Sequence, residues 1–184
     1  GRLVVRETHV LRNNPATKLA DWVAYRVSVD GMPLPPEAKK PKRRWKRDPD
    51  LPPENTLAPK DYKGAHKALG TDRGHQAPLA SFYGYTAVQA TNYLSNITPQ
   101  RSGLNQGTWR ILEERVRDLA ARGVPVSVVT GPLYEREMPS LPNASRPHRV
   151  PSGYWKVVLL DPDPEAVGDE AVAGFVMDQD LPRK

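Results

Sequence analysis

The feature that most constrains the fold is one long amphipathic stretch, residues 104–122, with strand-like segments on both sides of it. Its apolar residues recur at helical spacing, and Gly123-Val124-Pro125 would end a helix directly afterwards. Runs rich in β-branched and aromatic residues cover residues 3–10, 22–29, 126–130, 154–160 and 171–177. Because strands and helices do not alternate regularly, we expect an α+β fold with a central, mostly antiparallel sheet.

The length of the chain fits a single domain. At 184 residues it can bury a core without covalent cross-links, and no Gly/Ser linker separates two cores. We therefore predict one domain over residues 1–184.

Residues 32–60 are rich in proline and in positive charge. Proline fixes φ and removes a backbone donor, so this segment is predicted to be a loop within the domain. Its basic side chains surround Trp45 and are Lys39, Lys40, Lys42, Arg43, Arg44, Lys46 and Arg47. Such a run is often only a solvated surface. With a net charge of +6 we favour a loop that faces nucleic acid, in which Trp45 either packs the loop down or stacks on a base.

The sequence contains no cysteine, which excludes disulfides and thiolate zinc sites. No apolar run approaches the length of a membrane span, so we expect no membrane partner. The chain starts at Gly1 rather than at Met, and we expect a trimmed product whose targeting segment is not part of this sequence.

His75 follows Asp72-Arg73-Gly74 and precedes a turn of small residues. Hydrolysis of a phosphodiester needs an activated water and neutralised phosphoryl oxygens. A neutral imidazole near pH 7 accepts a proton from water, and an arginine binds an anionic phosphate. The alternative is a hydrogen-bonded structural histidine. The presence of Arg73 and Asn105 in the same chain favours catalysis by His75.

Asn105 is expected in the first turn of the predicted helix, where it has two interpretations. Asparagine is favoured as an N-cap, but its amide oxygen is also a ligand for a hard metal ion. Glu113 and Arg117 lie eight and twelve positions later, so all three residues can border one cleft, although Glu113 and Arg117 alone would be an ordinary i,i+4 ion pair. This oxygen-donor set suits Mg²⁺ better than zinc, because Mg²⁺ keeps several waters. The residues therefore favour a metal-dependent nuclease.

These segments resemble the DNA/RNA non-specific endonuclease family, whose active site is the ββα-metal (His-Me) finger, and in particular its Serratia-type members. The resemblance extends over nearly the whole chain and rests on residues 13–15, 21–25, 56–59, 72–81, 92–100, 104–107, 130–136 and 151–157. It implies a central antiparallel sheet flanked by helices. The histidine is then expected on the ββ part of the finger and the asparagine on its helix.

The resemblance also implies roles for individual residues. The general base falls on His75 and the direct Mg²⁺ ligand on Asn105, with waters completing the octahedron. Glu113 corresponds to the glutamate that hydrogen-bonds metal-bound water. Mn²⁺ is expected as a substitute for Mg²⁺.

Five further residues are assigned by the same resemblance, with Arg73 and Arg117 placed beside His75 and Glu113 among the catalytic residues. The arginines that bind phosphate correspond to Arg73, Arg117 and Arg43. Asn92 and Asn96 correspond to asparagines that shape the site, and we place them with the substrate-binding residues.

The function implied is a magnesium-dependent endonuclease that cleaves single- or double-stranded DNA and RNA and leaves 5′-phosphate ends. The alternatives are a non-catalytic nucleic-acid-binding module and a nuclease toxin domain with an immunity partner. A homodimer and an inhibitor protein are further expected partners. We expect a secreted or periplasmic location, although secreted relatives carry disulfides and this chain has no cysteine.

Overall fold

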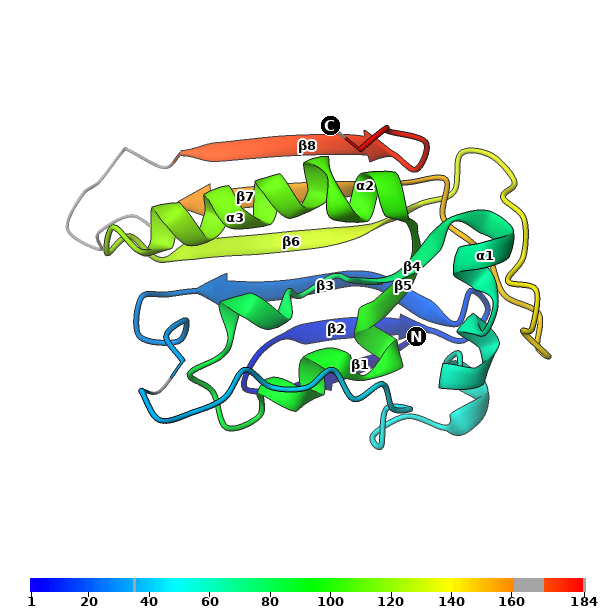
Figure 1. Cartoon of the computed structure of the whole chain (residues 1–184), viewed down its shortest axis with the longest axis horizontal. Coiled ribbons are helices and arrows are strands. Elements are labelled where there is room, and N and C mark those ends of the chain that lie inside the picture. The colour runs from blue at the N-terminus through cyan, green and yellow to red at the C-terminus, as the bar shows by residue number, and fades with distance from the viewer. Residues whose placement is uncertain (35, 161–170, 184) are drawn as a thin grey trace.

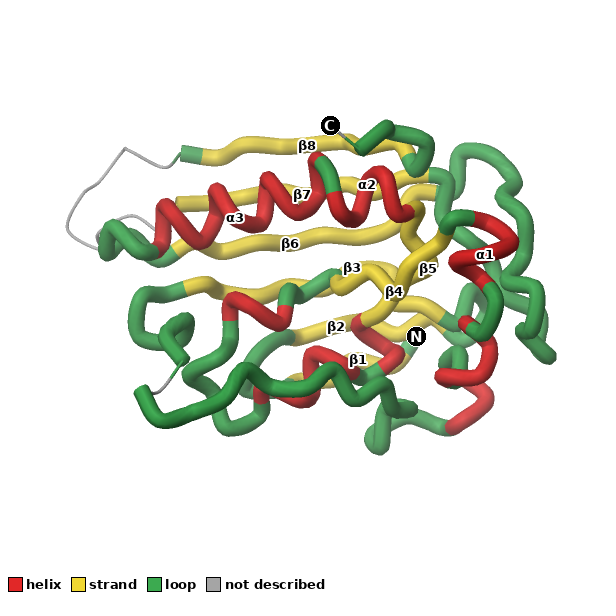
Figure 2. The backbone as a smooth tube through the Cα atoms, viewed as in Figure 1, coloured by secondary structure: helices red, strands yellow, loops and turns green. Residues whose placement is uncertain are grey.

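The computed structural model describes residues 1–34, 36–160 and 171–183 (Figures 1 and 2). Six strands form one antiparallel sheet in the order β1-β2-β3-β6-β7-β8, and two others form a separate antiparallel pair. The large sheet contains β1 (Arg2–Val5), β2 (Val10–Asn14), β3 (Leu19–Val27), β6 (Val126–Leu133), β7 (Gly153–Leu160) and β8 (Val172–Asp178). The small pair contains β4 (Thr71–His75) and β5 (Ile97–Arg101).

Helices and short 3₁₀ turns complete the fold. The α-helices of the described residues are α1 (Ala65–Leu69), α2 (Ser102–Gln106) and α3 (Thr108–Ala120). The 3₁₀ turns are η1 (Pro53–Asn55), η2 (Pro59–Tyr62), η3 (Leu79–Ser81), η4 (Val88–Asn92) and η5 (Leu94–Asn96). Helix α3 lies across the large sheet, against β3 and β6 (Figure 1). This arrangement confirms the predicted α+β class with a mostly antiparallel sheet.

The alternation of side chains along the strands decides which face of the sheet is buried. On β6, Val126 and Val128 are buried, and on β7 Tyr154, Lys156 and Val158 are buried on the same inward face. Neighbouring side chains on a strand point to opposite faces, so this pattern has period two. The inward residues of β3 and β6 pack with buried apolar residues of α3, chiefly Val116 and Ala120. No described helix is long and apolar enough to cross a membrane.

The predicted strands are present with different limits. Residues 3–10 form the end of β1, a turn and the first residue of β2, rather than one strand. Strand β3 covers residues 19–27 instead of 22–29, and β6 continues beyond residue 130 to residue 133. The turn between β1 and β2 contains the buried residues Thr8 and His9. Thr8 and the valines on both sides of the turn give the segment the β-branched composition of a single strand.

The small pair β4-β5 has no clear strand pattern in the sequence, because glycine and proline interrupt it. Gly74 faces Thr98 in the pair and lies against the side chain of Gln100. A Cβ at this position would stand 2.3 Å from Gln100 Oε1 and 2.7 Å from Gln100 Cβ. Glycine between Arg73 and His75 therefore allows β4 to approach β5 closely.

The helix predicted over residues 104–122 is two helices, α2 and α3, with Gly107 between them. Gly107 has φ −103° and ψ −116°, which interrupts the helical backbone. A Cβ there would lie 2.4 Å from the carbonyl oxygen of Gly103 and 3.3 Å from Cα of Arg183. After α3, Gly123 adopts φ +90°, in agreement with the predicted glycine stop.

The proline-rich segment 32–60 contains only short 3₁₀ turns and an isolated bridge from Lys46 to Tyr93, as expected for a loop; Pro35 lies outside the described residues. Its end is fixed by Asp48, which pairs with Arg6 and accepts a hydrogen bond of 2.5 Å from Ser95 Oγ. Arg6 also stacks on the Tyr93 ring, 5.1 Å from its centroid. These contacts hold the basic loop against the turns that follow β4.

Candidate active site

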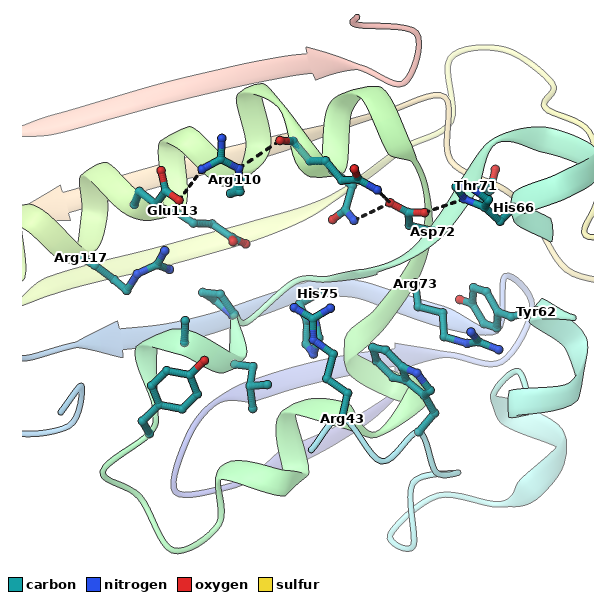
Figure 3. Close-up of a pocket in the computed structure, with 18 of the residues that line it drawn as sticks. Arg43, Tyr62, His66, Thr71, Asp72, Arg73, His75, Arg110, Glu113 and Arg117 are labelled. Atoms are coloured by element: carbon teal, nitrogen blue, oxygen red, sulfur yellow. Dashed lines mark hydrogen bonds and ion pairs between the residues drawn. The ribbon is translucent and has the colours of Figure 1, made fainter. Parts of the chain in front are cut away.

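A groove of about 740 Å³ runs between two walls (Figure 3). One wall is formed by α2 and α3, with Glu113 and Arg117, and the other by β4 and the basic loop, with Arg43 and His75. The groove also contains Arg73, Trp45 and Asn105. The structure therefore brings together all predicted site residues except Asn92 and Asn96.

His75 stands at the end of β4, partly exposed to the groove. Its Nε2 is 2.9 Å from Asn92 Oδ1, and the amide nitrogen of Asn92 donates to Gln89 Oε1 at 3.0 Å. Because Asn92 presents its oxygen, Nε2 carries the proton and the lone pair belongs to Nδ1. The pKa of His75 is lowered to about 4, mainly by burial; the Asn92 hydrogen bond opposes the shift, and the charge of Arg43 contributes to it. His75 is therefore a neutral proton acceptor at pH 7.

The guanidinium of Arg73 is held between aromatic rings. It lies 5.3 Å from the centroid of Tyr62 and 5.6 Å from that of Trp45, and Nη2 donates to the Pro59 carbonyl at 3.1 Å. Its Nε is buried without a hydrogen-bond partner among the described residues. Trp45 also packs on His75, with ring centroids 5.4 Å apart, so this tryptophan packs the loop down. Arg73 is thus oriented but keeps an N–H for a ligand.

Asn105 is not an N-cap. It is the fourth residue of α2, whose N-cap is Arg101 and has no side-chain cap bond. Asn105 Nδ2 instead donates to Asp72 Oδ2 at 3.0 Å, beside Gln106 Nε2 at 2.8 Å. In the part of the chain that the structure describes, no residue hydrogen-bonds to Asn105 Oδ1. Asp72 therefore fixes the amide so that its oxygen is free for a ligand.

Glu113 and Arg117 lie on the groove side of α3, and they do not form the ion pair that their spacing permits. Glu113 Oε1 and Arg117 Nη1 are both buried without a partner among the described residues. Burial raises the pKa of Glu113, while the charges of Lys156 and Arg117 oppose this shift. Unpartnered buried polar atoms are costly, so these two atoms on the groove side of α3 suit a site that a bound ligand completes.

Asn92 and Asn96 occupy a different place from the one predicted. Both are completely buried, and neither lines the groove. Asn96 Oδ1 accepts from Ala77 N at 2.9 Å, and its Nδ2 donates to the carbonyls of Ala77 and Thr91 at 2.9 and 2.8 Å. Asn92 holds Nε2 of His75. They support the histidine and its turn from behind, and the assignment to substrate contacts is corrected.

Three groups at the site were not assigned a role from the sequence. Asp72 accepts four side-chain hydrogen bonds, and these lower its pKa against the effect of burial. Lys156 is completely buried, with Nζ 4.0 Å from the Trp109 ring centroid and 3.3 Å from Tyr25 Oη. The inward alternation of Tyr154, Lys156 and Val158 was the signal that could have located this lysine. His66, at the α1 end of the groove, had no distinguishing sequence signal.

Side chains that could hold a metal ion at the site are few. Across residues 1–34, 36–160 and 171–183, no group of three or more His, Cys, Asp or Glu side chains could hold a metal ion. Oxygen donors that face the groove include the amides of Asn105 and Gln106 and the carboxylate of Glu113. This set fits a hydrated ion with few direct protein ligands, as Mg²⁺ prefers.

The family model described as DNA/RNA non-specific endonuclease matches residues 1–182. The chain belongs to this family. The nuclease of Serratia marcescens is 49% identical over 182 residues, which are 98% of this chain and 65% of that protein. Nuclease C1 of Cunninghamella echinulata is 30% identical over 94% of this chain and 69% of its own length. The mouse mitochondrial nuclease EXOG is 30% identical over 92% of this chain and 47% of its own.

A solved structure of the EndoG/EndoGI complex, described as showing the mechanism of EndoG inhibition, contains a similar chain. The TM-score is 0.81 with 23% sequence identity, and the match covers 98% of this chain and 75% of the other. At this identity the similarity shows the fold alone, and it agrees with the α+β architecture described above.

Proposed function

We propose that this chain is a magnesium-dependent endonuclease that hydrolyses phosphodiester bonds of DNA and RNA and leaves 5′-phosphate ends. One observation carries the proposal: neutral His75 faces a wall on which Asn105, Glu113 and Arg117 keep polar atoms without partners. A proton acceptor, an oxygen ligand and a cation thus border one groove. Membership of the endonuclease family supports the class of substrate.

The residues present fit a hard cation. Asn105 Oδ1 would hold Mg²⁺ directly, and Glu113 would hold it through a water molecule. Mn²⁺, which accepts the same oxygen donors, is a predicted substitute. When bound, the ion supplies positive charge next to the phosphoryl oxygens.

His75 performs the proton transfer in this mechanism. Its Nδ1 accepts a proton from a water molecule, whose oxygen forms a bond to phosphorus in line with the departing 3′ oxygen. The bond from phosphorus to the 3′ oxygen breaks, and that oxygen takes up a proton from solvent. Asn92 Oδ1 accepts from Nε2–H throughout and supports the imidazolium that forms. The 5′ fragment of the cut strand therefore ends in a 3′ hydroxyl, and the phosphate stays on the other fragment.

Arginine side chains hold the phosphate while its charge increases. Arg73 Nε and Arg117 Nη1 are buried donors without partners, and Arg43 lies exposed at the groove. Hydrogen bonds from guanidinium groups to phosphate are short and strong. Contacts to phosphate carry no information about the base, which accounts for cleavage without sequence specificity.

Plasmid nicking tests the proposal. The full chain should convert supercoiled plasmid to nicked and linear forms with Mg²⁺ and should degrade RNA, and a chelator should abolish both activities. His75→Ala should lower the rate by about 10²–10⁴-fold while the protein still retards plasmid in a gel. A non-catalytic binding module would instead retard plasmid without nicking it, and undiminished cleavage by His75→Ala would remove the general-base assignment.

A protein partner is proposed from the similarity of folds. The EndoG/EndoGI complex shows that a chain of this fold binds an inhibitor protein, and we propose the same kind of partner here. A toxin role with an immunity protein and a homodimer stay predictions. Several relatives are named mitochondrial, and a secreted or periplasmic location of this chain stays a prediction.

A further inference from the structure

The groove extends beyond His75 and Asn105 to α1, where Lys63, Gly64 and His66 line it. We propose that Lys63 and His66 form a second phosphate subsite, which binds the backbone phosphate adjacent to the scissile one. This inference rests on the proposed endonuclease function and adds a contact that the mechanism itself does not use.

Asp72 determines how the His66 ring is presented. His66 Nδ1 lies 3.0 Å from Asp72 Oδ1 and 3.3 Å from Ser102 Oγ. A carboxylate only accepts hydrogen bonds, so Nδ1 carries a proton and Nε2 is the free ring nitrogen. In the imidazolium form Nε2 is a second N–H donor, of the kind that phosphate oxygens accept. The ring is therefore held through one nitrogen and available through the other.

The same carboxylate connects His66 to the proposed metal ligand. Asp72 Oδ1 contacts His66, whereas Asp72 Oδ2 accepts from Asn105 Nδ2 at 3.0 Å. His66 and Asn105 thus hydrogen-bond to different oxygens of the Asp72 carboxylate. Figure 3 shows Asp72 and His66 together at one end of the groove. A subsite at His66 is consequently next to the scissile phosphate.

Lys63 supplies a permanent charge at this end. Its side chain is exposed and lines the groove. The turn is fixed by Gly64, whose φ of +73° favours glycine, and by Asn143 Nδ2, which donates to the Lys63 carbonyl at 2.5 Å. The lysine is therefore anchored by its backbone while its ammonium group is free.

A phosphate is the ligand that this chemistry fits. Each strand of B-form DNA carries one negative charge per 3.4 Å of helix axis, so a strand seated at His75 continues past either end of the groove with further phosphates. The carboxylate at the α1 end, Asp72, is already occupied by four hydrogen-bond donors. The side chains left for a ligand at that end are the Lys63 ammonium group and the His66 ring.

Short oligonucleotides of defined charge provide the test. Each substrate has one cleavable phosphodiester, and the linkage on its 5′ or 3′ side is either a charged phosphorothioate or a neutral methylphosphonate. The enzymes are the full chain, Lys63→Ala, His66→Ala and the double variant. Lys67→Ala is the matched control, because Lys67 is exposed on the same helix but does not line the groove.

For the wild type, a neutral linkage on one side should raise KM about two- to tenfold with little change in kcat. With the charged substrate, the double variant should already show the higher KM that the wild type shows with the neutral linkage. Its KM should then be the same for charged and neutral linkages, whereas Lys67→Ala should behave like the wild type. A double variant that keeps the full dependence on linkage charge overturns the subsite, as does a wild type indifferent to both flanking linkages. Failure of the wild type to cut any substrate would instead overturn the endonuclease function itself.

Discussion

Lowering the pH protonates the proposed general base, and the surroundings of His75 determine where the loss of activity should begin. Burial lowers its pKa to about 4, with Arg43 adding to the effect and Asn92 opposing it. At pH 5, about nine-tenths of a base with this pKa is neutral, against about 3% of a histidine at its ordinary value of 6.5. The two cases differ by about 30-fold in active enzyme, which is a large signal for a rate measurement.

The measurement is kcat/KM against pH, because this ratio reports ionisations of the free enzyme. Initial rates on a short labelled oligonucleotide at constant ionic strength, with Mg²⁺ at saturation, should stay near their maximum down to about pH 5. Glu113, whose pKa burial raises from 4.5, also titrates on the acid side. Glu113→Gln removes that ionisation, so an acid limb that remains in this variant belongs to His75.

Neutralising Arg43 tests the electrostatic part of the argument. Its charge disfavours the imidazolium, so Arg43→Gln should move the acid limb to higher pH. Lys42→Gln removes the same charge from the neighbouring position, outside the groove lining, and should leave the limb in place. An acid limb centred between pH 6 and 7 that persists in Glu113→Gln would refute the reasoning, because it would show that His75 ionises as an exposed histidine does.

Three further predictions concern single residues. Asn105→Ala should nearly abolish cleavage at ordinary Mg²⁺ with thermal stability little changed, because Asn105 is not a cap. Asn105→Asp keeps an oxygen ligand and should retain more activity. Mg²⁺ titrations of both variants, measured beside thermal melts, test this prediction. Asn96→Ala removes three buried hydrogen bonds and should lower the free energy of unfolding by about 3–5 kcal/mol in urea denaturation. Burial lowers the pKa of His9 to about 3, so unfolding takes up a proton between pH 3 and 6.5. The contribution of His9 to the free energy of unfolding is complete above pH 6.5 and should fall by about 2 kcal/mol on going to pH 5. His9→Gln should remove this part of the pH dependence of stability.

Local patterns in the sequence predicted the large sheet, because residues such as Tyr154 and Val158 alternate regularly across it. They also located the helix that carries Glu113 and Arg117. They did not predict β4 and β5, which are short and interrupted by glycine and proline. They also did not predict the break at Gly107, where a Cβ would meet the backbone of Gly103 and, from the distant C-terminal segment, that of Arg183.

The residue types at the site could be predicted from the sequence, but their contacts could not. His75, Asn105 and Arg73 were identified by residue type and resemblance, and they do meet in one groove. The buried position of Asn96 and the hydrogen bonds to Asp72 were not predictable, since each joins segments far apart in the chain. The depressed pKa of His75 is a consequence of burial and so appears only in the folded structure.

The buried charges of Lys156, Glu113 and Arg117 at the groove are a property that only the folded structure reveals. Burial lowers the pKa of Lys156 to about 8, while the charge of Glu113 opposes that shift, so the lysine is mostly charged at pH 7. Glu113 thus interacts electrostatically with two cations, Lys156 and Arg117, and one carboxylate cannot neutralise both. A buried charge without a full partner is costly, and Arg117 Nη1 has no hydrogen-bond partner among the described residues. An anionic phosphate in the groove would neutralise this excess, so the wall that orients Glu113 is also built to attract the substrate.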